Sequence, residues 1–284
     1  MTAEWAAKDS RDYIVTFELN STNDCPADFE LPSSMAAFDT GLFLPGGDRD
    51  WFGRPLYPPR VLLLKDDTLS IVTHPSTGEP LRQCAMRQIS SVESGHMLLK
   101  GWLRLTGSGF DYTVRYNTRG IGPVLRFIRC FRSGLLGNGP HGTSKADAGA
   151  GLDIKFGNAL TIELDSRESV LVQLFQPPGE VRRHRWLAGD LLALTGRRLL
   201  WITDRERGFY SRYGSVASYA PLEAVAGVAA DRGAAFLQVD LKYGSAWRIP
   251  ISAGREVADE FAAALERLKT DKSAPGFGGS SSRG

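Results

Sequence analysis

The stretch LLALTGRRLLWITD, residues 191–204, decides how this chain is interpreted. Two short apolar runs flank a Thr-Gly-Arg-Arg segment, and short runs joined by a polar, glycine-containing turn predict a β-hairpin. A second stretch, RVLLLKDDTLSIVTH at residues 60–74, repeats the pattern with Asp66-Asp67 in the turn. At one constant offset the matching positions are Leu62 with Leu192, Leu64 with Leu194, Leu69 with Leu199 and Thr73 with Thr203.

Four further pairs of segments recur in the same order along the chain. They are 15–21 with 160–166, 87–95 with 221–229, 101–107 with 235–241, and 110–117 with 245–252. The offset drifts slowly, as small loop insertions would produce, and the period is far longer than that of a solenoid. Chance similarity between short β-rich segments is the alternative, but the shared order favours a duplicated domain.

Both copies end in a helical pattern. In the second copy the apolar positions recur at helical spacing, acidic residues crowd the first turns and basic residues the last, which suits the helix dipole. These apolar positions are Val257, Phe261, Ala264, Leu265 and Leu268; their counterparts in the first copy are Val124, Phe127, Ile128, Phe131 and Leu135. Before the second helix, Trp247, Ile249 and Ile251 share one face of a strand that we expect to end at Pro250 or to lie at an edge.

An L-L-x-L-T-x-R-R-L hairpin, a P-L-x-x-V segment, two further strands and a terminal helix resemble the bacterial pleckstrin-homology-like (PH-like, GRAM-like) domains. The second copy carries this resemblance between Leu187 and Lys269, through Leu194-Thr195, Arg197-Arg198-Leu199, Pro221-Leu222 and Val225. In the first copy Lys65-Asp66-Asp67-Thr68 replaces the T-x-R-R motif. The resemblance implies a mainly β (α+β) fold of two PH-like domains, each a bent antiparallel sheet or partly open barrel capped by its C-terminal helix.

The composition of the connecting segments sets the expected boundaries. We expect a first domain at 1–135 with an insertion at about 22–59, a Gly/Pro/Ser linker at 136–152, a second domain at 153–270 and a disordered tail at 271–284. The sequence leaves two roles open for the insertion: it covers one sheet, or it forms a docking surface.

Bulk properties restrict the function classes. A chain of 284 residues with 42% apolar residues is long enough for two domains, and a net charge of +2 argues against nucleic-acid binding. Cys25, Cys84 and Cys130 lie far apart and are odd in number, which indicates free thiols in a reducing compartment. The N-terminus has no apolar signal region, and no apolar run reaches the roughly 18 residues of a membrane span. We therefore expect a cytoplasmic protein, or one peripheral at the inner membrane face.

The motifs tested for chemistry point away from catalysis. The segment GNGPHGTS at 137–144 lacks the Gly-Lys-Ser/Thr ending of a phosphate loop and is interpreted as linker. Asp48 and Asp50 are interpreted as a solvated turn rather than a cation site, and His184 as a surface histidine among arginines. We expect no catalytic residues, no cofactor and no metal. Four tryptophans in strand contexts are expected in the core: Trp102, Trp186, Trp201 and Trp247.

Two groups of arginines are candidate sites. Arg182, Arg183 and Arg185 precede the hairpin and Arg197 and Arg198 lie in its turn, and guanidinium groups bind phosphate oxygens well. Solvated surface is the interpretation we favour for this group, with anionic-ligand binding as the alternative. Three further arginines are expected on the helix face opposite the apolar one, where they would meet an anionic membrane: Arg126, Arg129 and Arg132. That helix is also needed to close its own sheet.

These observations predict a non-catalytic binding or scaffold module that presents loops and sheet edges to a protein or peptide partner. Self-association can use the same edges. A peripheral membrane module that binds anionic headgroups through the arginines is the alternative. An enzyme of unfamiliar type is the third hypothesis, and it requires a deep pocket with clustered ionisable groups.

Overall fold

The computed structural model describes residues 15–49, 55–97, 100–118, 120–136, 151–165, 168–181, 185–206, 209–210, 214–230, 236–244, 246–250 and 254–273. The protein is mainly β, as expected, with large sheets of five, seven and three strands and three two-stranded sheets. Each large sheet has two edge strands, so none of them closes into a barrel. None of the described helices has the length and apolar character required to cross a membrane.

The five-stranded sheet belongs to the first half of the chain, which we define as residues 15–136. Its order is β1 (Phe17–Leu19), β2 (Thr40–Leu44), β5 (Arg60–Lys65), β6 (Thr68–Thr73) and β7 (Arg82–Ala85), all antiparallel. Strand β2 falls inside the segment expected as an insertion at about 22–59. That segment therefore supplies a strand of the sheet rather than a separate addition.

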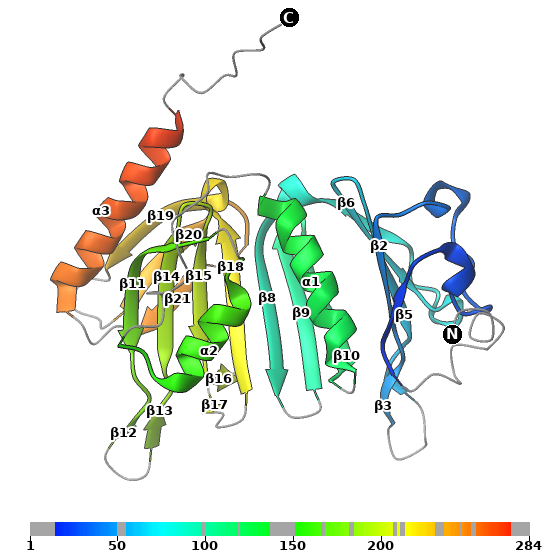
Figure 1. Cartoon of the computed structure of the whole chain (residues 1–284), viewed down its shortest axis with the longest axis horizontal. Coiled ribbons are helices and arrows are strands. Elements are labelled where there is room, and N and C mark those ends of the chain that lie inside the picture. Colours follow the sequence, from blue (N-terminus) through cyan, green and yellow to red (C-terminus); the bar gives the residue numbers. More distant parts are fainter. Residues whose placement is uncertain are drawn as a thin grey trace, which may run out of the picture.

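The seven-stranded sheet joins the two halves of the chain, the second half being residues 151–273 (Figure 1). The first half supplies β10 (Phe110–Asn117), β9 (Lys100–Gly107) and β8 (Ile89–Met97). The second half supplies β18 (Gly214–Pro221), β15 (Arg198–Thr203), β14 (Asp190–Thr195) and β11 (Val170–Gln176). The junction is the antiparallel pair β8 and β18, whose register runs from Val92 opposite Tyr219 to Met97 opposite Gly214.

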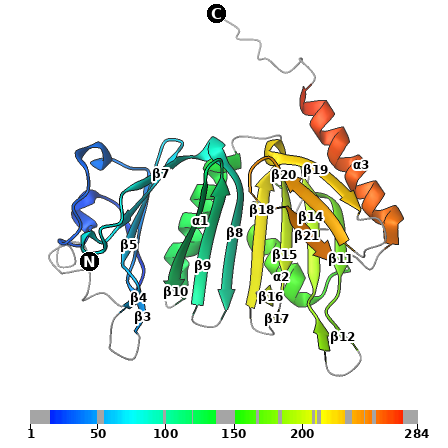
Figure 2. The ribbon, with the colours of Figure 1, turned by 180° about the vertical axis from the view of Figure 1, so that it is seen from behind.

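The three-stranded sheet consists of β19 (Val225–Ala230), β20 (Phe236–Leu241) and β21 (Trp247–Pro250). It lies over the second-half strands of the large sheet, on the side away from α1 and α2 (Figure 2). Strand β21 is at the edge of its sheet, as predicted, and Pro250 is its last described residue. The small sheets pair β3 (Gly47–Arg49) with β4 (Pro55–Tyr57), β12 (Gly179–Val181) with β13 (Arg185–Leu187), and β16 (Arg205–Glu206) with β17 (Phe209–Tyr210).

Two of the three helices were predicted. Helix α1 (Ile121–Leu136) and helix α3 (Gly254–Ser273) each follow three consecutive strands, and α3 continues into the segment expected as a tail. Helix α2 (Ile154–Glu163) was not predicted, and the proposed match of 15–21 with 160–166 is wrong: the first contains strand β1, the second the end of α2. Asp153 begins this helix, where its Oδ1 accepts a hydrogen bond from the N–H of Lys155 at 2.8 Å.

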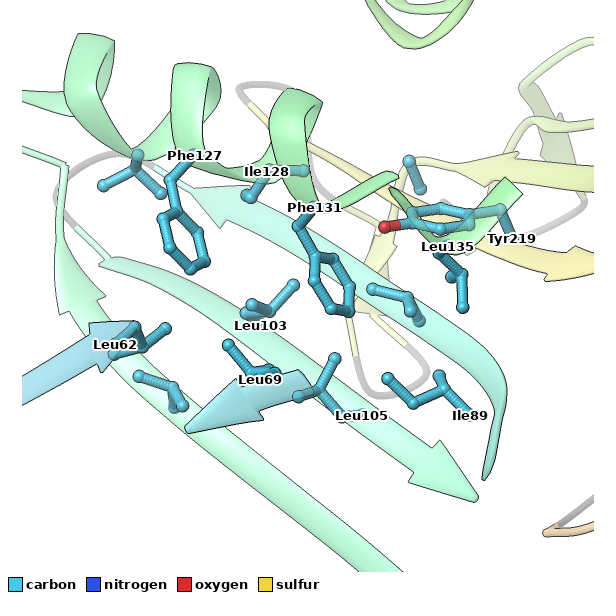
Figure 3. Close-up of a cluster of buried hydrophobic side chains, with 14 of the residues drawn as sticks. Leu62, Leu69, Ile89, Leu103, Leu105, Phe127, Ile128, Phe131, Leu135 and Tyr219 are labelled. Carbon is cyan, nitrogen blue, oxygen red and sulfur yellow. The ribbon is translucent and has the colours of Figure 1, made fainter. Parts of the chain in front are cut away.

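The largest hydrophobic core extends over both halves. The predicted apolar face of α1 lies against β5, β6, β8 and β9, and Figure 3 shows Phe127 and Phe131 pointing from the helix towards Leu103 and Leu105. Phe156 of α2 belongs to the same core, where its ring centre lies 5.2 Å from that of Phe175 in β11. Burying a side chain of this size stabilises the fold by about 1.5–3 kcal/mol.

A second core encloses the three-stranded sheet, and a third covers the outer face of the five-stranded sheet. In the second, Phe261, Ala264 and Leu265 of α3 are buried against β14, β15 and the three-stranded sheet, as the helical pattern predicted. In the third, Phe29 and Met35 pack on the outer face of β2 and β5. Part of the segment at about 22–59 thus covers a sheet, which was one of the two roles left open for it.

The two hairpins have the same register, as predicted. Leu64 lies opposite Leu69 in β5–β6, and Leu194 lies opposite Leu199 in β14–β15. Each half then has a short 3-10 turn, at Met86–Gln88 and Leu222–Ala224, followed by a strand whose register shifts after its first residue, Ile89 or Val225. These positions differ by two residues from the predicted match of 87–95 with 221–229. The strand that precedes each hairpin also pairs in the same register. Leu42 of β2 faces Leu62, and Leu174 of β11 faces Leu192, the position that matches Leu62.

Candidate functional site

The basic turn of the opening hairpin lies inside the protein. Arg198 is fully buried, and its Nε and Nη2 donate to the two carboxylate oxygens of Glu168 at 3.0 and 2.5 Å. Thr195 Oγ1 accepts hydrogen bonds from the N–H groups of Arg197 and Arg198, and the hydroxyl donates to Glu168. The interpretation of Arg198 as solvated surface is therefore wrong, because the side chain is buried and its Nε and Nη2 atoms are engaged by Glu168. The partner carboxylate follows α2, a helix that the sequence pattern did not reveal.

Arg132 is a second correction. It is only 3% exposed rather than on the outer face of α1, and its Nη1 pairs with the carboxylate of Glu163 and donates to the carbonyl oxygen of that residue at 3.1 Å. The guanidinium groups of Arg132 and Arg198 lie 5.8 and 5.3 Å from the centre of the Tyr219 ring. Arg197 lies 3.8 Å from a carboxylate oxygen of Asp165. This buried cluster fastens α1, α2 and the junction strand β18 together.

The other predicted arginines are distributed differently. Arg126 is exposed and pairs with Glu18, and Arg129 is exposed on α1. Arg182 and Arg183 lie outside the described residues, as do Asp50, His184 and the segment 137–144. The side chains of Arg185, Asp48 and Trp186 are also outside them. No group of three or more His, Cys, Asp or Glu within the described ranges is arranged to hold a metal ion.

A cleft of about 420 Å³ lies where the two halves meet. Its lining combines residues of the seven-stranded sheet with Trp247 and Arg248 of the three-stranded sheet, so it opens on the face that carries the smaller sheet. The first half contributes Ser91, Glu93, Arg104, Phe110 and Asp111 to its lining. The second half contributes Trp201, Ser218, Gly244, Trp247 and Arg248. Neither half of the chain forms this cleft alone.

The floor of the cleft follows from the strand register. Arg104 lies opposite Glu93, Glu93 opposite Ser218, and Ser218 opposite Trp201, across four neighbouring strands. Adjacent strands are about 4.8 Å apart, so the backbones that carry Glu93 and Trp201 are roughly 10 Å apart. The small side chain of Ser218 stands between them. This row therefore forms a slot with a carboxylate on one side and an indole on the other.

Two tryptophans form one wall of the cleft, and a third tryptophan holds the Glu93 carboxylate on the opposite side. The Trp201 and Trp247 rings are 6.0 Å apart and tilted by 46°, and Trp201 Nε1 donates to Asp190 Oδ1 at 2.9 Å. On the other side, Trp102 Nε1 donates to Glu93 Oε1 at 2.6 Å. The Trp102 indole lies across Gly95, where any Cβ atom would overlap it. Trp247 is buried as predicted, whereas Trp102 and Trp201 are half-buried.

The charges that line the cleft balance in number. Arg104 donates from Nε and Nη2 to the two carboxylate oxygens of Asp111 at 2.8 and 2.5 Å. The hydrogen bond from Arg104 lowers the pKa of Asp111, and the same bond raises the pKa of Arg104. Arg248 lies 5.1 Å from the centre of the Phe236 ring. Glu93 is the remaining carboxylate of the lining.

The turn between β20 and β21 fastens the second half onto the first beside the cleft. Ser90 Oγ donates to the carbonyl oxygen of Tyr243 at 2.6 Å, although the two residues are far apart in the sequence. Gly244 adopts a left-handed backbone with φ of +91°, and a Cβ atom there would overlap the Cγ2 methyl of Thr106. The close approach of the turn to β9 therefore depends on glycine.

Sequence reasoning missed this cleft because its residues come from six strands and the turns between them, in both halves of the chain. The available signal was polar and aromatic residues at positions of β8 and β9 that face away from the core. No protein-family model matches the chain, and no curated protein matches it.

Proposed function

We propose that this chain is a non-catalytic binding module of two PH-like units, and that it holds an extended segment of a partner protein in the cleft between them. The observation that carries the proposal is the cleft itself, which requires the β8–β18 junction and therefore both halves.

The agreement between the two halves supports PH-like units related by duplication. Each half can be followed as a hairpin-containing sheet, a short 3-10 turn, three antiparallel strands and a terminal helix. The matching hairpin registers and the equal register shifts after Ile89 and Val225 support the same proposal. On this proposal, β8, β9 and β10 of the first half correspond to the three-stranded sheet of the second half, but they became part of the seven-stranded sheet.

The chemistry of the cleft favours a peptide. Its volume falls in the range of small-ligand sites, which is roughly 300–1,000 Å³. Tryptophan and arginine are enriched where protein interfaces gain most of their binding energy. The lining holds two carboxylates and two guanidiniums, whose balance does not favour a phosphate backbone or an anionic bilayer.

The membrane alternative receives less support. Of the three arginines that the membrane alternative requires on the outer face of α1, Arg132 is buried and Arg126 pairs with Glu18. The apolar face of α1 fills the largest core, so it has no second face of that kind to insert into lipid.

Selection of peptides from a random dodecapeptide display library tests the proposal with the full chain as bait. Ser218→Leu fills the slot, and Ser215→Leu is the matched control because alternate positions of β18 face opposite sides of the sheet. We expect the wild type and Ser215→Leu to enrich the same peptides, and Ser218→Leu to lose them while keeping its melting temperature. Failure of the wild type to enrich any peptide, or unchanged affinities in Ser218→Leu, would overturn the proposal.

A further inference from the structure

We propose that the slot above Ser218 accepts the side chain of a lysine or an arginine of the bound segment. This inference rests on the proposed peptide-binding function, and names the part of the peptide that the cleft recognises.

The geometry of the slot suits one long, narrow side chain. Ser218 is the only small residue in the row from Arg104 to Trp201, and Glu93 and Trp201 stand on either side of it. A separation of roughly 10 Å between their backbones leaves room for one aliphatic chain between a carboxylate and an indole. Lysine and arginine each have a chain of methylene groups that packs on apolar surface while the charged end reaches a polar partner.

The carboxylate of Glu93 is held in position by one hydrogen bond and can accept further hydrogen bonds. Trp102 Nε1 occupies Oε1, and among the described residues no hydrogen bond is made to Oε2. The neighbouring guanidinium of Arg104 donates two hydrogen bonds to Asp111 and attracts Glu93 through space, so the Glu93 carboxylate keeps its capacity to accept hydrogen bonds. Arg248, the other cation of the lining, is directed to the Phe236 ring. Glu93 is thus the charged group of the cleft best placed to pair with a ligand.

The aromatic wall adds a second attraction for a cation. A guanidinium or ammonium within about 6 Å of an indole ring is attracted by the negative face of that ring. Trp201 and Trp247 form a tilted pair beside the slot, and the hydrogen bond to Asp190 holds the Trp201 ring in position. Serine hydroxyls at Ser91 and Ser218 offer further acceptors in the lining.

Other side chains fit this chemistry less well. An acidic side chain would be repelled by Glu93 and would find Arg104 already paired with Asp111. An apolar side chain would remove water from Glu93 without giving its carboxylate a new partner, which costs free energy. A basic side chain alone satisfies both the carboxylate and the aromatic wall.

Titration with single-residue probes tests the inference through the tryptophan fluorescence of the cleft. The probes are the N-acetyl methylamides of lysine, arginine and norleucine, and norleucine keeps the aliphatic chain without the charge. We expect saturable binding of the two basic probes, with norleucine at least tenfold weaker. Glu93→Gln retains an acceptor for Trp102, so this variant should bind the basic probes at least tenfold more weakly through the loss of charge alone. Glu223→Gln, an exposed site elsewhere, is the control and should bind as the wild type does.

Three outcomes would overturn the inference: absence of binding by both basic probes, equal binding of norleucine and lysine, or unchanged lysine binding in Glu93→Gln. The display selection separates these failures from failure of the proposed function. Peptides that lack basic residues, are enriched by the wild type and are lost in Ser218→Leu would keep the peptide-binding function and reject the basic side chain.

Discussion

The guanidinium of Arg198 and the carboxylate of Glu168 form an ion pair in which neither side chain has any exposed surface. The pair connects the turn of the opening hairpin to the segment between α2 and β11, and Arg198 also donates to the carbonyl oxygen of Glu163 at 2.6 Å. A buried pair of this kind is costly to break, because the remaining charge has no water around it.

We expect Glu168→Gln and Arg198→Met each to lower the free energy of unfolding by about 3–5 kcal/mol, because each leaves one charge buried without its partner. The double variant Glu168→Leu/Arg198→Met should lose much less than the sum of the two. Urea unfolding followed by circular dichroism measures these values, with the exposed Glu223→Gln as a control expected to change stability by less than about 0.5 kcal/mol. Additive losses in the double variant would show that the two residues act independently.

The same pair predicts how stability depends on pH. Burial by itself would raise the pKa of Glu168, but the charge and hydrogen bonds of Arg198 outweigh it and lower that pKa below its ordinary value of 4.5. A lowered pKa in the folded state stabilises the protein above pH 4.5, and this contribution is lost as the pH falls through the folded-state pKa. The double variant Glu168→Leu/Arg198→Met should lack this part of the acid-induced loss when unfolding is measured between pH 7 and pH 3.

Asp204 affects the pH dependence of stability in the direction opposite to Glu168, so its contribution is measured with a variant of its own. Burial raises the pKa of Asp204 despite the nearby Lys155, so its protonation on acidification favours the folded state. Asp204→Asn should therefore steepen the acid-induced loss of stability relative to the wild type. A shallower loss in Asp204→Asn would contradict this sign.

Tyr219 is expected to be more important for its ring than for its hydroxyl. The ring is fully buried beneath Arg132 and Arg198, whereas its hydroxyl has no hydrogen-bond partner among the described residues. Tyr219→Phe should therefore equal or exceed the wild type in stability, and Tyr219→Ala should cost about 3–5 kcal/mol through the cavity it leaves. Thermal or urea unfolding checks both, and a loss above about 1 kcal/mol in Tyr219→Phe would indicate an ordered water on the hydroxyl.

Gly244 is expected to be required for the close packing of the β20–β21 turn against β9. Gly244→Ala combines a left-handed φ with overlap on Thr106, whereas Gly109→Ala has a left-handed φ of +78° and no atom within 4 Å of the new Cβ. Both variants carry the backbone strain, so the extra loss in Gly244→Ala measures the contact between the halves. We expect that difference to exceed about 1 kcal/mol in urea unfolding. Equal losses would show that the turn moves away at little cost.

The three cysteines, none of which forms a disulfide, should differ in reactivity. Burial, with a contribution from Asp28, raises the pKa of Cys25 to about 12, and burial raises that of Cys84 to about 11, so neither is a thiolate near neutral pH. Cys130 is exposed on α1. Ellman's reagent at pH 7.5 should modify one thiol rapidly in the native protein and three in urea, and Cys130→Ser should abolish the rapid phase. A rapid phase that persists in Cys130→Ser would identify another accessible thiol.

Local patterns in the sequence predicted the hairpins and both terminal helices. The register of Leu194 opposite Leu199 follows from two apolar runs around a glycine-containing turn, and the buried face of α3 follows from helical spacing. These features depend on residues close together in the chain, so turn chemistry and periodicity contain the necessary information. The match of 15–21 with 160–166 failed because similar residues stand in a strand in one place and after an Asp153 N-cap in the other.

The sequence by itself determined a mainly β protein with two hairpins in one register and two amphipathic helices, because each depends on neighbouring residues. Only the tertiary structure decided that Arg198 meets Glu168, that Arg132 turns inward, and that Glu93, Ser218 and Trp201 stand in one row. The Arg198–Glu168 pair forms within the second half, whereas the other two arrangements bring the halves together, and the row requires β8 of the first half to pair with β18 of the second. That pairing joins segments more than a hundred residues apart, and no local pattern specifies which of two sheet edges will meet.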